Sequence, residues 1–413
     1  MFPRPIFRVV RSYARLRHCY ALVVSCSIPE HSGAPVDVIP PVPSARQRED
    51  ATSLGELTTI GVGGAVASVI NAATEEEVIE AVRQADEDGV PVLVLGGGSN
   101  ILASDETFDG VVVRDTRRDI HLLQEGGCEG ANLRVLAGTP WDDFVVHTIE
   151  NEWMGVEALS GIPGTVGAAP VQNIGAYGQE VAGSIARVRV WDRQAGRPRE
   201  IPMADLHFGY RSSILKESLR HGWGPSPRYI VLSVDFQLRI ASLSAPVAYK
   251  QLASALGVQM GARVPAAELR AAVLELRRSK GMVLDDADRD TYSCGSFFTN
   301  PILTAEQADA LPEDAPRFPV TDLSHTFLGK ESPEVAGLVK SSAAWLINHA
   351  GFNPGFGLPG PAALSTKHCL ALTNRGGASA AQIRDLARTV RDGVESTFGV
   401  RLEPEPVLVG GGL

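Results

Sequence analysis

The stretch Val90–Asn100 reads VPVLVLGGGSN, and it determines how the surrounding chain is interpreted. Val90–Leu95 is an apolar run rich in β-branched residues, which is typical of a buried strand. Glycines after a strand let successive amides point outward and form a nest for phosphate oxygens, but a plain turn has the same composition. The loop is neither a Walker loop, since no lysine follows it, nor a GxGxxG fingerprint. The loop residues are Gly96, Gly97, Gly98, Ser99 and Asn100.

The residues before this strand predict another strand and a helix. Val66–Ile70 is expected to be a strand, and Thr74–Glu77 is a capping box whose hydroxyl and carboxylate can bind free amides at a helix start. Apolar side chains then recur at helical spacing up to Gly89. The unit is therefore strand–helix–strand, and it ends in the glycine-rich loop.

The residues after the loop predict a second group of strands. A helix is expected from Thr139, with Pro140 in its first turn, where a missing amide is tolerated. These elements indicate an α+β domain built around glycine-rich loops. The predicted strands are Val111–Arg114, Leu133–Ala137, Val188–Trp191 and Tyr229–Leu238.

A second glycine-rich segment, Gly161–Gly178, has few side chains that could pack. Ordering such a backbone as a passive loop would be entropically expensive. A flat ligand lying against bare backbone, such as a flavin that accepts hydrogen bonds from the amides, would account for this composition. A long irregular loop is the alternative.

The C-terminal half is expected to be mainly helical from about Val247. Pro265–Lys280 and Ala378–Phe398 carry apolar side chains on one helical face. The closing strand, Val400–Val409, contains two prolines, which argues against a central place in a sheet.

Composition indicates a soluble globular protein of two or three domains, since the chain has 413 residues with 44% hydrophobic and 21% charged residues. The net charge of −10 argues against non-specific nucleic-acid binding, although local basic pockets for phosphate stay possible. The five cysteines are scattered without metal-ligand spacing, which indicates reduced thiols in a cytosol. No apolar run reaches the length of about 18 residues that a membrane span needs.

The first 51 residues differ from the rest of the chain. Five arginines precede the short apolar patch Tyr20–Val24, which is too short for a signal segment. A disordered extension is predicted, and targeting or partner binding is the alternative.

Three side chains on separate segments suggest an active site. Arg211 follows Phe208-Gly209-Tyr210, Ser296 lies between a glycine and Phe297-Phe298, and Glu405 lies between two prolines. A cation, a hydroxyl and a carboxylate are candidates for catalysis together, but each alone has an ordinary surface or turn interpretation. Ser296 is no triad nucleophile, since no Gly-x-Ser-x-Gly elbow surrounds it. Cys294 is either a competing acid or a buried structural thiol.

Six motifs occur in one order and together closely resemble the UDP-N-acetylenolpyruvoylglucosamine reductase (MurB) family. The resemblance covers roughly residues 52–410. It implies an α+β fold with a two-part FAD-binding domain of the vanillyl-alcohol oxidase-like type and a smaller C-terminal α+β substrate-binding domain. The motifs are Thr59–Gly64, Leu95–Leu102, Gly161–Gly178, Phe208–Lys216, Gly295–Pro301 and Leu402–Glu405.

The resemblance also implies domain limits. The FAD-binding domain would span residues 52–242, in lobes of roughly 52–115 and 116–242, and the substrate-binding domain would span 243–399. The boundary could also lie as late as the loop at Lys280. Residues 400–413 would return Glu405 to the active site.

By the same resemblance, non-covalent FAD and NADPH are the expected cofactors, and UDP-N-acetylglucosamine enolpyruvate is the expected substrate in peptidoglycan synthesis. Ser296 would donate a proton, and Arg211 and Glu405 would assist, either by Glu405 orienting Arg211 or by a protonated Glu405 polarising the substrate carboxyl. A monomeric cytoplasmic enzyme without membrane, nucleic-acid or metal binding is expected. The cofactor contacts would be Gly96, Gly97, Gly98, Ser99, Asn100, Gly161, Ile162, Pro163, Gly164, Gly167, Ala168, Asn173, Ile174, Gly175 and Arg277. The substrate contacts would be Tyr177, Tyr249 (on a closing loop), Lys280, Asn300 and His368.

The chain departs from the family pattern at two places besides its N-terminus. His368 stands where some relatives have a substrate-binding glutamine, and Phe352–Pro361 is rich in glycine and proline. Two other functions remain to be weighed. An oxidase that tethers flavin through histidine would need one near Gly61–Gly64 or Gly96–Asn100, where none occurs. A non-catalytic UDP-sugar sensor would be expected to have lost the catalytic residues, which are present.

Overall fold

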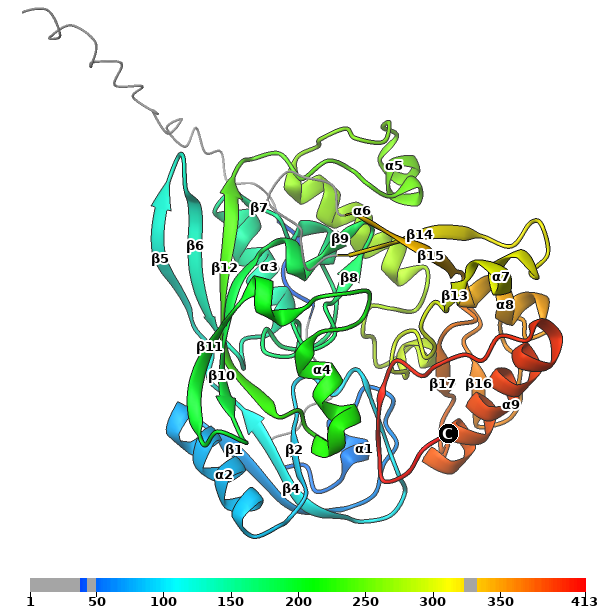
Figure 1. The fold of residues 1–413 in the computed structure, drawn as a ribbon, viewed down its shortest axis with the longest axis horizontal. Helices are drawn as coiled ribbons and strands as arrows, with labels where there is room; N and C mark the ends of the chain where they lie inside the picture. The colour runs from blue at the N-terminus through cyan, green and yellow to red at the C-terminus, as the bar shows by residue number, and fades with distance from the viewer. Residues whose placement is uncertain (1–37, 43–49, 323–332) are drawn as a thin grey trace, which may run out of the picture.

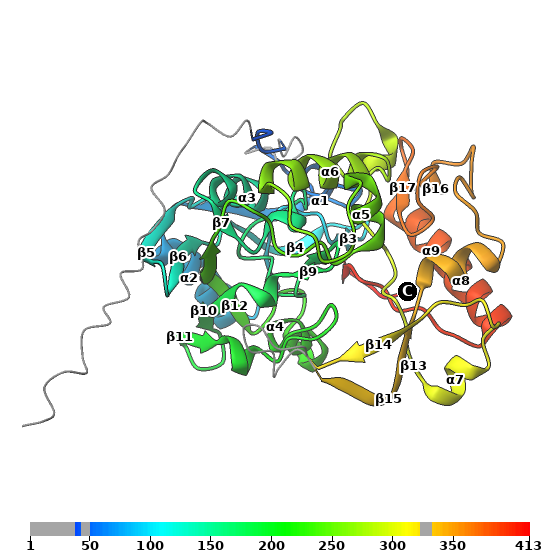
Figure 2. The same cartoon turned by 90° about the horizontal axis from the view of Figure 1, so that it is seen from above.

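The computed structural model describes residues 38–42, 50–322 and 333–413. Figures 1 and 2 show the strands β5 and β6 on one side of the molecule and the C-terminal helices α8 and α9 on the opposite side. Among the residues described, no helix combines the length and the apolar content needed to span a bilayer.

The first sheet is parallel and has the strand order β1-β4-β2. The predicted strand–helix–strand unit is confirmed, but β4 lies between the other two strands. The helix α2 begins as predicted, because the Thr74 hydroxyl accepts from the Glu77 amide, while the Glu77 carboxylate accepts from the amide of Ala73. The elements are α1 (Leu54–Leu57), β1 (Val66–Ala72), α2 (Glu75–Glu87), β2 (Val92–Val94), β3 (Ile101–Ala103) and β4 (Phe108–Asp115).

The second sheet is antiparallel and has the order β11-β10-β12-β6-β5, with β7 paired to one end of β12. All four strands predicted for the region after the glycine-rich loop are present, but Val111–Arg114 belongs to β4 of the first sheet and not to this one. The predicted helix begins at Trp141 with Pro140 as its N-cap residue. The strands β5, β7 and β11 were not identified from the sequence. The elements are β5 (Ile120–Gly126), β6 (Gly130–Leu136), α3 (Trp141–Glu150), β7 (Trp153–Met154), β10 (Ile185–Asp192), β11 (Arg197–Pro202) and β12 (Tyr229–Ile240).

Strand β12 belongs to two apolar cores. Ile230 and Leu232 pack with α2 and the first sheet, whereas Val234 and Phe236 pack in the core beneath α3. The first part of the strand, Tyr229–Leu232, is a continuous apolar run, as expected where both faces are buried, and from Leu232 to Leu238 apolar and polar residues alternate. Both patterns identify β12 as a strand, and its place in both cores puts the two sheets against each other.

The C-terminal region mixes short strands with helices. The expectation of a mainly helical region is wrong for residues 302–374, where β13, β15 and β14 form one antiparallel sheet and β16 pairs with β17. Strands of three to eight residues with exposed positions have too little periodicity to be recognised. The elements are α5 (Lys250–Leu256), α6 (Ala266–Arg278), β13 (Ile302–Thr304), α7 (Ala305–Asp309), β14 (Arg317–Thr321), β15 (Glu334–Ser341), α8 (Ala343–His349), β16 (Ala362–Leu364), β17 (Leu372–Asn374), α9 (Ala380–Phe398) and β18 (Val407–Val409).

The connecting segments hold further short elements. They are η1 (Glu157–Leu159), β8 (Gly175–Ala176), β9 (Gln179–Glu180), η2 (Val181–Gly183), η3 (Met203–Leu206), α4 (Ile214–Ser218), η4 (Leu219–Trp223) and η5 (Arg289–Thr291).

Two predicted segments differ from the structure in their extent. The predicted extension over residues 1–51 lies mostly outside the described residues, but Val38 packs against the core of the second sheet and Ala51 is buried. The closing strand is limited to Val407–Val409, because Pro404 and Pro406 interrupt it, and among the described residues it pairs with β3 alone. The domain boundary stays a prediction. We infer the later position, after Lys280, because α5 and α6 pack with η1 rather than with the C-terminal core.

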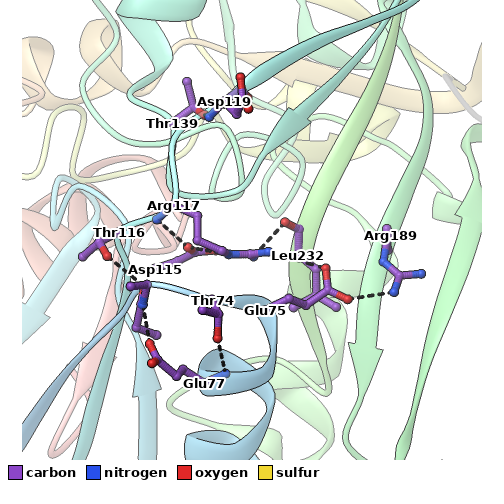
Figure 3. Close-up of polar contacts among 12 residues, drawn as sticks. Thr74, Glu75, Glu77, Asp115, Thr116, Arg117, Asp119, Thr139, Arg189 and Leu232 are labelled. Atoms are coloured by element: carbon purple, nitrogen blue, oxygen red, sulfur yellow. Dashed lines mark hydrogen bonds and ion pairs between the residues drawn. The ribbon is translucent and has the colours of Figure 1, made fainter.

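Arg117 joins the two sheets through a polar cluster (Figure 3). Its guanidinium lies 2.6 Å from an Asp115 carboxylate oxygen at the end of β4 and donates to the Leu232 carbonyl of β12 at 3.0 Å. It also pairs with Glu75 of α2, whose carboxylate contacts Arg189 of β10 at 2.7 Å. Burial alone would lower the pKa of Arg117, but Asp115 and Glu75 outweigh it and the pKa is raised.

We expect Arg117→Met to lower the free energy of unfolding by about 2–3 kcal/mol, because it leaves the Asp115 carboxylate without its buried cation. Urea unfolding followed by circular dichroism measures this loss. Arg118→Met is the matched control, since Arg118 is the exposed neighbour. Equal stability of the two variants would show that the cluster does not hold the sheets together.

Candidate active site

A cavity of about 450 Å³ is lined by the glycine-rich loops, by α6 and by the C-terminal region. Every residue predicted for the site lines this cavity except Gly161, Asn173 and Asn300. The structure therefore brings together segments that are more than 300 positions apart in the chain, such as Gly96 and Glu405.

The two glycine-rich loops pack directly against each other. A Cβ atom on Gly97 would lie 2.4 Å from the Gly164 Cα, and one on Gly98, where φ is +60°, would lie 2.0 Å from the Leu57 carbonyl oxygen. The Ser99 hydroxyl donates to the Pro163 carbonyl at 3.0 Å. Glycine is required here for the close approach of the backbones. This close approach is what places both loops along one wall of the cavity.

The C-terminal segment connects two other parts of the site. The Glu405 amide donates to the Phe297 carbonyl at 2.8 Å, and the Thr299 amide donates to the Glu403 carbonyl at 3.0 Å. Two residues later, the Val407 amide donates to the Asn100 carbonyl at 2.9 Å. Figure 1 shows this segment, in red, returning from α9 toward the middle of the molecule. It therefore lies between the Ser296 segment and the first glycine-rich loop.

Arg211 and Glu405 form an ion pair in the cavity. The Arg211 Nε lies 3.1 Å from a Glu405 carboxylate oxygen, and the two side chains are 21% and 11% exposed. A second nitrogen of the guanidinium donates to the Gly175 carbonyl at 2.9 Å. Burial acts to lower the pKa of Arg211, but the Glu405 charge outweighs it, so the pKa is raised. The guanidinium is thus a fixed positive charge.

Backbone strain is concentrated at this site. Asn173, Tyr177 and Arg211 have φ angles of 48°, 50° and 53°, which residues other than glycine seldom adopt. Strained conformations of this kind persist where the surrounding structure holds a side chain in a required direction. At Arg211, the ion pair and the carbonyl contact supply that constraint.

Gln172 and Lys216 belong to the site and were not predicted. The Gln172 side chain donates to the Glu405 carboxylate at 3.2 Å and accepts from the Asn100 amide group at 2.8 Å. The Lys216 ammonium lies 3.4 Å from both the Gln172 side-chain oxygen and the Glu405 carbonyl. Burial lowers the pKa of Lys216, although Glu405 opposes this. Both residues lie inside motifs that the sequence had singled out.

Ser296 and Cys294 have different surroundings. Within the part of the chain that the structure describes, the Ser296 hydroxyl has no hydrogen-bond partner, and Ser296 is one of the residues that line the cavity. The Cys294 thiol is buried and donates to the Ile101 carbonyl at 3.1 Å. Burial raises the pKa of Cys294 to about 12. These observations favour the interpretation of Cys294 as a structural thiol.

Tyr177, Tyr249 and Lys280 gather at one end of the cavity. The two tyrosine rings meet edge to face with centroids 5.7 Å apart, and the Lys280 ammonium lies 5.5 Å from the Tyr177 ring centroid. Tyr249 is 45% exposed, so it lies at the mouth of the site. Burial lowers the pKa values of Lys280 and of Arg277.

The cavity lining is basic although the whole chain is acidic. Four cationic residues line it (Arg211, Lys216, Arg277 and Lys280), against two acidic ones (Asp115 and Glu405). Such a lining suits ligands that carry phosphate groups.

Three residues predicted for the site have structural contacts instead of a place in the lining. The Asn300 side-chain oxygen accepts from the Ala343 amide at 3.0 Å, at the start of α8. The Asn173 side chain donates to the Glu180 carboxylate at 2.9 Å, and the Gly161 carbonyl accepts from Arg277 at 3.2 Å. Their contacts with ligands stay predictions, and for Asn300 the side-chain oxygen is already engaged.

His368 gives a pH-dependent prediction. Burial, followed by the Lys280 charge, lowers the pKa of His368 to about 4, below its value in the unfolded chain. The unfolded state therefore binds a proton first as the pH falls from about 6.5 to 4, and the folded state loses stability over that range. We expect His368→Gln to be more stable than the parent protein by about 2 kcal/mol at pH 5 and equally stable at pH 8. Thermal or urea unfolding at both pH values is the measurement, and an effect of the same size at pH 8 would contradict the assignment.

Comparison with known proteins identifies the family of this chain. Residues 65–200 match the model of a FAD-binding domain, and residues 287–409 match that of the UDP-N-acetylenolpyruvoylglucosamine reductase C-terminal domain. The predicted fold class, a FAD-binding domain followed by a smaller α+β domain, is confirmed.

Similar full-length proteins agree with the family models. UDP-N-acetylenolpyruvoylglucosamine reductase of Cutibacterium acnes is 48% identical over 359 residues, which cover 86% of this chain and 89% of that protein. The enzyme of the same name from Nocardia farcinica is 49% identical, covering 87% and 89%. The crystal structure of the Thermus caldophilus enzyme shares the fold, with a TM-score of 0.55 and 24% identity over 86% of this chain and 97% of that one. The chain therefore belongs to the UDP-N-acetylenolpyruvoylglucosamine reductase family.

Proposed function

We propose that this oxidoreductase reduces UDP-N-acetylglucosamine enolpyruvate to UDP-N-acetylmuramate in peptidoglycan synthesis, with NADPH as the electron donor and non-covalent FAD as the carrier. The observation that carries the proposal is the arrangement of Ser296, Arg211 and Glu405 around one basic cavity beside two glycine-rich loops. Each chemical role that the reaction requires has a candidate side chain there.

The residues present fit FAD. The glycine-rich loops have little side-chain bulk along their wall of the cavity, and Arg277 and Lys216 supply positive charge. Gly96–Asn100 would hold the pyrophosphate, and the segment from Gly161 would lie along the ring system. When bound, FAD supplies the hydride transfer, which no side chain can perform.

Arg211 would stabilise the negative charge that develops on the substrate carboxylate and the adjacent carbon. Its guanidinium is held at three places, by Glu405, by the Gly175 carbonyl and by the strained backbone at its own position. A preorganised donor loses little free energy to reorientation during the reaction, and one such donor is commonly worth about 3 kcal/mol.

Ser296 would protonate the substrate carbon. Its hydroxyl has no partner among the described residues, so no hydrogen bond has to be broken before it donates. Phe297 and Phe298 are fully or almost fully buried and fix the backbone that follows it. A hydroxyl is a weak acid, and a short transfer away from water to an enolate-like carbon compensates for this.

Glu405 would orient Arg211. Of the two roles considered from the sequence, the geometry favours orientation of Arg211, because one Glu405 carboxylate oxygen lies 3.1 Å from the Arg211 Nε and accepts from the Gln172 side chain at 3.2 Å. Glu405 is thus proposed as a positioning residue.

Lys280, Tyr177 and Tyr249 would bind the sugar-nucleotide part of the substrate. The ammonium can contact a diphosphate, and the two rings present flat apolar surfaces at the mouth of the cavity. The exposure of Tyr249 fits a residue that closes over substrate after it enters.

The experiment that tests this function uses the purified protein under anaerobic conditions. The flavin absorbance near 450 nm is expected to bleach on addition of NADPH and to return when UDP-N-acetylglucosamine enolpyruvate follows. Recovery without this substrate, or bleaching that the substrate does not reverse, would overturn the proposal.

Ser296→Ala separates the two half-reactions. We expect it to slow flavin reoxidation by substrate by about 10²–10⁴-fold, while reduction by NADPH changes little, because the proton is required only in the second half-reaction. Stopped-flow absorbance measures both rates. Thr299→Ala is the matched control, since it removes a hydroxyl from the same segment that does not line the cavity. Equal slowing of both half-reactions in Ser296→Ala would reject this role.

A further inference from the structure

We propose that the segment Val38–Val42, which we call the strap, completes a buried polar cluster and through it holds the first residue of the second glycine-rich loop. The cluster consists of Asp142 on α3 and Arg270 on α6. In this proposal the strap supports the FAD-binding region, although it precedes the matched domain by more than 20 residues.

The cluster is an ion pair with two parallel contacts. Two guanidinium nitrogens of Arg270 donate to the two carboxylate oxygens of Asp142, at 2.7 and 2.9 Å. The Arg270 side chain is fully buried, and that of Asp142 is 8% exposed. Charges buried to this degree need a partner for every remaining donor and acceptor.

The strap supplies the missing partners. Arg270 donates from Nε to the Ile39 carbonyl and from a terminal nitrogen to the Pro40 carbonyl, both at 3.0 Å. In return, the Val42 amide donates to Asp142 at 2.8 Å. Val38 packs against the apolar core of the second sheet. All of these polar contacts use the backbone of the strap.

The sequence of the strap suits this role. In Pro40-Pro41-Val42-Pro43, Val42 is the one residue with a backbone N–H, and this N–H is the donor to Asp142. Prolines restrict the free chain to extended conformations, so less conformational entropy is lost when the strap binds. The neighbouring prolines have no amides that would be left unpaired on docking.

Asp142 carries the effect of the strap to the loop. The oxygen that accepts from Arg270 at 2.7 Å also accepts from the Gly161 amide at 2.7 Å. The Gly161 carbonyl accepts from Arg277, which lies about two turns further along the same face of α6. Gly161 has a φ of 69°, and a Cβ there would lie 2.6 Å from Leu274. The amide of Gly161 is therefore held by Asp142, and its carbonyl is held by Arg277 of α6.

Loss of the strap would remove the acceptors of two Arg270 N–H groups and the Val42 amide that donates to Asp142. Burial raises the pKa of Asp142, and Arg270 with the amides of Val42 and Gly161 outweighs this and lowers it. With fewer partners, the carboxylate would move toward water or toward Arg270, and Gly161 would lose its anchor.

The test compares two truncations of the full chain. Removal of residues 1–37 keeps the strap, and removal of residues 1–42 deletes it. We expect the shorter protein to have an apoprotein melting temperature about 2–5 °C lower than the other. Its FAD dissociation constant should be about three- to tenfold higher, measured by the quenching of flavin fluorescence on binding. Equal melting temperatures would overturn the proposal, and so would a lower melting temperature with unchanged FAD affinity.

A point variant tests the same contact with the strap present. Val42→Pro removes the N–H that binds Asp142, and Pro41→Ala is its control because Pro41 has no hydrogen bond to the cluster. Val42→Pro should weaken FAD binding in the same direction as the truncation, and Pro41→Ala should not. Equal FAD affinities of the two variants would contradict the proposed role of the strap.

The FAD readout depends on the proposed place of the flavin beside the loop. The melting temperature of the apoprotein does not. If the protein with residues 1–37 removed failed to bind FAD at all, the proposed function would fail, and the melting temperatures would still decide whether the strap stabilises the cluster.

Discussion

The ion pair between Arg211 and Glu405 joins the second sheet region to the last ten residues of the chain. The Arg211 Nε and a Glu405 carboxylate oxygen lie 3.1 Å apart, and both side chains are mostly buried, so removal of one partner leaves the other charge uncompensated. The Glu405 amide also binds the Phe297 carbonyl, so the position of this one residue sets that of the segment carrying Ser296. Glu405 thus contacts both Arg211, the proposed stabilising cation, and the segment that carries Ser296, the proposed proton donor.

A similar arrangement recurs around the two glycine-rich loops. Glycine-rich backbone has few side chains of its own to pack, so each loop is fixed by hydrogen bonds from polar side chains of other segments. Asn100 is tied to Glu405 through Gln172, and Gly161 is tied to α3 and α6 through Asp142 and Arg277. The physical requirement is the same in both places, since a ligand that lies on backbone needs that backbone to be preorganised.

The sequence was sufficient for the elements with strong periodicity and for the residues inside motifs. It located α2, α6, α9 and β12, and nearly all of the predicted site residues line one cavity. It did not reveal β13–β17, whose strands are short and partly exposed. It could not reveal that Val38–Val42 docks on Arg270, because the contact joins the Arg270 side chain to backbone carbonyls about 230 positions earlier, and no local pattern marks such a pairing. Contacts of this type depend on tertiary structure alone.

A double-mutant cycle on Arg211 and Glu405 tests the central claim most directly. Arg211→Met, Glu405→Gln and the double variant would be compared by the rate at which substrate reoxidises the reduced flavin in anaerobic stopped flow. If the two residues act as one unit, the double variant should be about as slow as Arg211→Met alone, since residues in contact are not additive. Independent effects that multiply in the double variant would contradict the account.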